Sequence, residues 1–155
     1  MHDLVLRWVY DVGAEKGLSA DELRILEAPP GELTREEVAL AAWRVEHLSV
    51  LAWALGKASL PRAHERHQPR WLARKVGFLD DGARALVTGA TLRPAGELLQ
   101  YSVVMGDILS HLEDAIVKSP DRETALALAV AAGRHAAISW LVGETRLEIE
   151  NRADA

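Results

Sequence analysis

An all-α fold is predicted for this chain: a single-domain irregular helical bundle with three long helices, about 35–55, 94–118 and 120–142, and several short ones. Apolar residues recur at helical spacing, and no Asn-Gly or Asp-Gly turn joins alternating apolar runs. Alanine and arginine, both good helix formers, are abundant, and Arg outnumbers Lys 14 to 4. At this length we expect one domain, residues 1–155, that buries about two-thirds of the surface its unfolded chain exposes.

The N-terminal third is predicted to contain two short helices. The first follows from an apolar stripe at helical spacing, formed by Leu4, Val5, Trp8, Val9 and Val12. We expect it to end at Gly17, because glycine readily takes the left-handed turn after a helix. Ser19 and Glu22 have the spacing of a capping box and predict a second helix over about 20–27.

A second capping box, Thr34 to Glu37, predicts the start of the first long helix, which Gly56 should terminate. Residues 57–69 then read as a long loop, followed by short helices at about 70–76 and 81–88. Pro94 is expected at the first helical position of the next long helix. The last one should be capped by Ser119–Pro120 and closed by Gly143, leaving 144–155 as coil or a frayed helix.

Composition excludes several classes of protein. The chain has no cysteine, so it has no disulfide framework and no thiolate nucleophile. Its uncharged apolar stretches, such as residues 48–55, are far shorter than the ~20 residues of a membrane span. We therefore expect a cytoplasmic protein that does not enter a membrane. The net charge of −5 argues against nucleic acid as a partner.

Charge is unevenly distributed along the chain. Residues 1–40 hold nine acids and four bases, whereas residues 57–75 hold six bases and one acid. Either segment could be a binding surface, although a solvated loop and helix face is the simpler interpretation.

Three ionisable residues lie within the apolar part of the first long helix: Arg44, Glu46 and His47. Apolar side chains occupy nearly every face of this helix from residue 45 onward, so little surface remains for water. A buried charge without a partner is costly, and each group therefore needs one. Arg44 could pair with Glu97 or Asp107 of the next long helix.

Glu46 could pair with Arg93 or with Arg134. The resulting hypothesis is a cross-helix network that determines which helices pack together. The alternative is a pocket for a small anionic ligand, because a buried arginine matches a carboxylate or phosphate. Both interpretations use the same charged residues of the long helices: Arg44, Glu46, Arg93, Glu97, Asp107 and Arg134.

No metal or cofactor is expected. Asp107 and His111 share a helix face, and His64 and His67 are three apart in a loop, but bundle metal sites need Glu-x-x-His motifs on paired helices. No glycine-rich nucleotide loop and no nucleophile elbow are visible. We expect His111 on the surface, His47 half-buried and hydrogen-bonded, and the tryptophans of the helix stripes in the core: Trp8, Trp43, Trp53 and Trp140.

Three segments resemble a bacterial family, the domain of unknown function 4272. They are Trp43–Glu46 with Leu48 and Val50–Gly56, then Leu92–Leu99, then Arg134–Leu141. They occur in the family's order and span about 40–142. The resemblance implies a small helical domain with no assigned activity. The chain departs from the pattern after Glu97, at Gly133, where an acid would commonly precede the arginine, and in its tail.

Two functions of different class follow as expectations. The first is a non-enzymatic protein-interaction module, for example one that neutralises a toxin or serves as a subunit of a complex, with a protein partner or a second copy bound. The second is a ligand-binding or catalytic domain that uses the charged cluster. No catalytic residue is assigned.

Overall fold

The computed structural model describes residues 2–29, 31–62, 65–80 and 82–153, excluding the side chains of 84, 87 and 144–153. The described chain is helical and contains no strand, which confirms the predicted all-α class. In chain order the elements are α1 (His2–Val12), η1 (Ala14–Gly17), α2 (Ala20–Glu27), α3 (Arg35–Ala54), α4 (Pro69–Lys75), α5 (Gly82–Thr88), α6 (Ala95–Lys118) and α7 (Arg122–Ala153).

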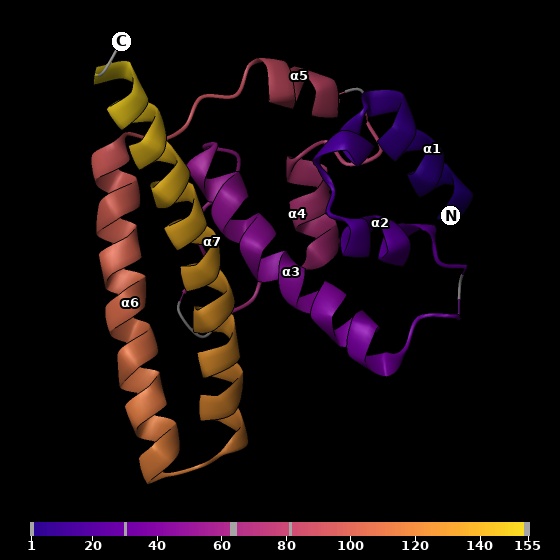
Figure 1. Ribbon diagram of the computed structural model, residues 1–155. Coiled ribbons are helices and arrows are strands. Elements are labelled where there is room, and N and C mark those ends of the chain that lie inside the picture. Colours follow the sequence, from indigo (N-terminus) through magenta and orange to yellow (C-terminus); the bar gives the residue numbers. More distant parts are fainter. Residues whose placement is uncertain (1, 30, 63–64, 81, 154–155) are drawn as a thin grey trace.

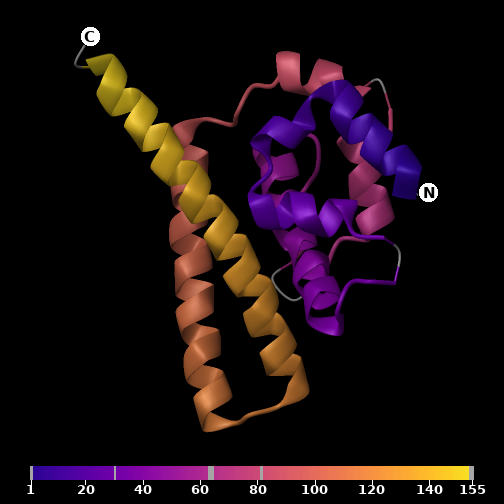
Figure 2. The ribbon, with the colours of Figure 1, turned by 45° about the vertical axis from the view of Figure 1, so that its right-hand side comes forward.

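The three long helices form the framework of the fold. Helices α6 and α7 are joined by a short connection and run antiparallel, side by side, while α3 crosses α7 (Figures 1 and 2). Helix α4 packs against α3, and α1 and α2 lie on the side of α3 away from α6 (Figure 1). The predicted set of three long helices with short ones around them is therefore correct.

Helix α3 is buried on two faces, which explains its lack of a single apolar side. One face contributes Val50 and Ala54 to a core shared with α6 and α7, which includes Met105 and Ile138. The other face contributes Ala52 to a smaller core with Leu72 of α4. This arrangement applies to the C-terminal half of α3, because residues 38–42 are all exposed.

Both capping boxes form as predicted. The Thr34 hydroxyl accepts the backbone N–H of Glu37, and the Glu37 carboxylate accepts the backbone N–H of Thr34 at 2.8 Å. Ser19 and Glu22 are paired in the same way at the start of α2. These bonds satisfy backbone N–H groups that have no partner within the helix.

Several helix ends differ from prediction. The first helix ends at Val12, before Gly17, because Gly13 takes the left-handed conformation with φ 73°. Pro94 precedes α6 and is not its first helical residue. The cap of α7 is Asp121, whose carboxylate accepts the backbone N–H of Thr124 at 2.8 Å, in place of Ser119–Pro120.

Helix α7 does not stop at Gly143. The backbone stays helical through this glycine to Ala153, so residues 144–153 of the predicted coil or frayed helix continue α7, and 154–155 lie outside the described residues. Its part Arg122–Gly143 is long and apolar enough to cross a membrane by length and composition, a test that core helices of soluble proteins also pass. Here the segment packs along α3 and α6.

Candidate functional site

A buried carboxylate lies where α3 crosses α7. The side chain of Glu46 is completely buried, and its two oxygens accept from two different arginines. The Nε–H of Arg134 on α7 donates to Oε2 at 3.0 Å, and the Nε–H of Arg66 in the 57–69 loop donates to Oε1 at 3.0 Å. We call these three residues the Glu46 cluster. The predicted pairing of Glu46 with Arg134 is therefore correct.

Arg134 also fastens the 57–69 loop to the bundle. This side chain is 1 % exposed, and its Nη1 donates to the backbone carbonyl of Arg62 at 3.0 Å. Its Nη2 donates to the carbonyl of Glu65. All three nitrogens of the guanidinium have acceptors, which is the condition for burying a charge without a large penalty.

Arg66 lies at the outer edge of the cluster, with its side chain 37 % exposed. Its guanidinium lies 4.7 Å from the ring centre of Trp43 and donates to the carbonyl of Ala42 at 3.3 Å. Arg66 therefore covers the carboxylate from the solvent side.

Gly133 allows this close crossing. A Cβ atom at Gly133 would lie 3.3 Å from the Cβ of Glu46, closer than most such contacts. Any side chain at position 133 would therefore crowd Glu46, and glycine permits the tight packing of α7 on α3.

The other members of the predicted network lie elsewhere. Arg44 does not reach Glu97 or Asp107, because it projects from the opposite side of α3, where its Nη2 lies 3.7 Å from Glu22 of α2. Its side chain is 62 % exposed. Asp107 is also exposed on α6.

Arg93 does not pair with Glu46 but caps α3. Its Nε donates to the carbonyl of Trp53 at 2.8 Å, and its backbone N–H donates to the carbonyl of Ala54. Its Nη1 contacts Glu97 at 3.1 Å, four residues on. The second family-like segment thus holds the end of α3 to the start of α6.

The histidines differ in environment. His111 is exposed, as predicted, and its Nδ1 lies 2.7 Å from the carbonyl of Asp107. His47 is half-buried as expected, but no hydrogen bond to it is present in the described part of the chain. Burial and the nearby Arg44 lower the pKa of His47, so its imidazole is neutral at pH 7.

Within the described ranges, no group of three or more His, Asp or Glu side chains is placed to hold a metal ion. His64 of the predicted loop pair lies outside the described residues, and His67 contacts the carbonyl of Ser59 at 2.7 Å.

Helix α4 exposes a basic face. Arg70 and Arg74 lie one turn apart, and Lys75 lies beside them around Trp71, whose ring centre is 5.4 Å from the Lys75 ammonium. His67 stacks on the same indole at 4.6 Å between ring centres. None of the three cations forms an ion pair with a carboxylate in the described chain. We call Arg70, Trp71, Arg74 and Lys75 the α4 surface.

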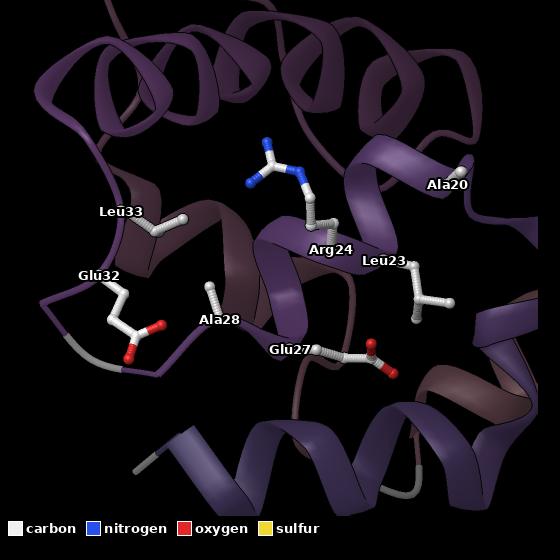
Figure 3. Close-up of a pocket in the computed structure, with 7 residues that line it drawn as sticks. All are labelled: Ala20, Leu23, Arg24, Glu27, Ala28, Glu32 and Leu33. Carbon is white, nitrogen blue, oxygen red and sulfur yellow. The ribbon is translucent and has the colours of Figure 1, made fainter.

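Two cavities flank α2. The larger, about 690 Å³, lies between α1, α2 and α3 and is mainly apolar, with Arg44 and His47 in its wall. The smaller, about 470 Å³, contains Arg24, Glu27 and Glu32 (Figure 3). There, Arg24 points toward α3, where it pairs with Glu37 at 2.6 Å, and Glu27 accepts the hydroxyl of Tyr10.

Sequence reasoning missed two features of the site. Arg66 was not predicted from the sequence as a partner of Glu46. The signal was the excess of bases over acids in 57–75, which leaves several cations without a carboxylate nearby in the sequence. Trp140 was expected in the core but is 59 % exposed, because it lies on the face of α7 that neither α3 nor α6 covers.

Comparisons with curated proteins and with solved structures found no match. A family model does match, over residues 1–150, a longer segment than the 40–142 expected from the three motifs. Its description is a domain of unknown function. Because this match covers nearly the whole chain, the chain belongs to the DUF4272 family.

Proposed function

We propose that this chain is a non-enzymatic protein-interaction module that binds an acidic segment of a partner protein on the α4 surface. The observation that carries the proposal is the exposed group of three cations around Trp71 with no carboxylate partner in the described chain. Unpaired cations next to an aromatic ring match a partner segment with carboxylates and apolar side chains. A toxin or a neighbouring subunit can present such a segment.

The charge of the α4 surface contrasts with that of the whole chain. The net charge is −5, yet this short helix presents Arg70, Arg74 and Lys75 together. A local field of opposite sign steers an acidic partner to one orientation, although salt weakens this steering.

The environment of Trp71 favours a protein over single-stranded nucleic acid. Base stacking requires a free aromatic face. The Trp71 indole is already stacked by His67 and approached by the Lys75 ammonium. Its remaining surface suits an apolar side chain better than a nucleobase.

The Glu46 cluster helps to hold α4 in place on the bundle. Leu72 is fully buried against α3 and fixes α4 to the bundle, while Arg134 holds the loop that precedes α4. A surface on a fixed element binds without first being ordered. Since the guanidinium of Arg134 is saturated by the chain itself, the cluster is better suited to a structural role than to binding an anion.

In-cell photo-crosslinking tests the proposal. A photoreactive residue replaces Gln68, an exposed residue at the start of α4 whose side chain makes no capping bond. We expect a crosslink to a protein, at a segment rich in Asp and Glu when mapped by mass spectrometry. The triple variant Arg70→Glu, Arg74→Glu, Lys75→Glu should abolish it.

The matched control reverses three exposed cations outside α4: Arg35→Glu, Lys118→Glu and Arg122→Glu. This variant has the same net charge and should retain the crosslink. Persistence of the crosslink in the α4 triple variant, its loss in the control, or a crosslink to nucleic acid would each contradict the proposal.

A further inference from the structure

Helices α1 and α2 do not close-pack on α3 but enclose the larger cavity with it. Arg24 of α2 pairs with Glu37 of α3 at 2.6 Å, and Trp8 of α1 contacts Phe78, which follows α4, at 5.1 Å between ring centres. The volume of about 690 Å³ is in the range of small-molecule sites. This space is therefore large enough for a ligand.

The wall of the cavity is mostly apolar. Both sides contribute aliphatic or aromatic side chains, among them Val5, Val9, Ile25, Leu26, Leu40 and Phe78. Leu40 and Phe78 remain 58 % and 40 % exposed, so the opening is apolar as well. An apolar body placed here would remove this surface from water, which is favourable.

Two polar groups face the cavity from α3. Arg44 and His47 are three residues apart and so lie on the same side of the helix. Arg44 has only a 3.7 Å approach to Glu22, and the neutral His47 ring has no hydrogen-bond partner within the described residues. Both therefore have N–H groups available to an acceptor.

The acids of the cavity lie on α2. The Ser19 backbone N–H and hydroxyl both donate to the Glu22 carboxylate and keep that carboxylate in its capping position. Asp21, the neighbouring residue, is exposed. A negatively charged head is therefore favoured against Arg44 and His47 of α3, on the side of Arg44 away from Glu22, whose Oε1 lies 3.7 Å from the Arg44 Nη2. This distribution of charge determines the orientation of a bound amphiphile.

We infer that the cavity between α1, α2 and α3 binds a small amphiphile with an apolar body and a carboxylate head, the head accepting from Arg44 and His47. The apolar body lies against α1, α2 and Phe78. This site is separate from the α4 surface and does not depend on it.

Calorimetric titration of the full chain with decanoate, below its micelle concentration, tests this inference. We expect one decanoate per chain. Arg44→Met should weaken binding about tenfold or more, the loss of one charge-assisted hydrogen bond. Ala41→Phe, which adds a ring at a cavity-lining position, should abolish binding.

The control Arg35→Met removes an exposed arginine of the same helix that does not line the cavity, and should leave the affinity unchanged. Decylamine, with the same chain and a cationic head, should bind at least tenfold more weakly than decanoate. The inference is wrong if decanoate does not bind, if Arg44→Met stays within about twofold of the wild type, or if decylamine binds as tightly. The α4 triple variant should bind decanoate normally, which separates this site from the protein-binding surface.

Discussion

Replacing Glu46 by alanine removes the centre of the buried cluster. The substitution leaves the Arg134 guanidinium, 1 % exposed, without the carboxylate that neutralises it, and also frees Arg66. Removing one partner of a buried ion pair costs about 3–5 kcal/mol. A single domain is stable by about 5–15 kcal/mol, so this loss is a large part of the total.

Urea unfolding followed by far-ultraviolet circular dichroism measures this effect. Arg134→Met should cost a similar amount, whereas the double variant Glu46→Leu, Arg134→Met should cost less than either single change, because two apolar side chains leave no stranded charge. Arg66→Ala should cost no more than about 1 kcal/mol, because that side chain is partly solvated. Glu36→Ala, at an exposed position of the same helix, serves as the control.

A change of less than about 0.5 kcal/mol in the free energy of unfolding of Glu46→Ala, the range of ordinary surface substitutions, would show that the Glu46 cluster does not stabilise the fold. Simple addition of the two single effects in the double variant would show no coupling between α3 and α7.

Three further predictions concern the helices and their ends. Gly143→Ala, at an exposed helical position with open space, should stabilise the chain by about 1 kcal/mol in thermal unfolding. Gly133→Ala should give no such gain, because its Cβ would crowd Glu46. Equal gains for the two variants would show that α7 does not pack tightly on α3 at Gly133. Thr34→Ala should cost about 1 kcal/mol in urea unfolding, and Thr34→Ser should restore most of it; no loss would mean that the capping box is dispensable. The pKa of His47 is lowered in the fold, so the unfolded chain binds more protons; stability from this group is complete above pH 6.5 and falls as the pH drops through the lowered pKa. His47→Gln should flatten that slope between pH 7.5 and 5.5, and an unchanged slope would assign it to another group.

Local patterns predicted the helices well because their causes are local. A capping box consists of two residues three apart, and both boxes form where the spacing placed them. The end of α7 was wrong because Gly143 only permits a left-handed turn and does not require one. The start of α7 was wrong because Asp121 can accept two bonds from Thr124, a stronger cap than Ser119–Pro120 offered.

The Glu46 cluster was only partly predictable, because two of its residues lie in helices with an apolar pattern and the third lies in a loop without one. Glu46 and Arg134 lie in periodic helices, where an ionisable residue among apolar faces implies burial and a partner. Arg66 lies in a loop without periodicity, so the run of bases in 57–75 did not show which base would reach Glu46. Arg44 was predicted to pair with α6 because the apolar faces from residue 45 onward implied that it was buried, whereas its side chain is 62 % exposed and lies near Glu22 of α2.

The packing of α3 on α7 depends most on the contacts that Arg134 and Arg66 make with Glu46 inside the fold. Hydrogen–deuterium exchange of arginine Nε–H groups by NMR measures this directly, with resonances assigned by Arg134→Lys and Arg66→Lys variants. We predict that the Arg134 Nε–H exchanges far more slowly than that of the exposed Arg35, and that this protection is lost in Glu46→Ala. Exchange of the Arg134 Nε–H as rapid as that of Arg35 in the wild-type chain would contradict it.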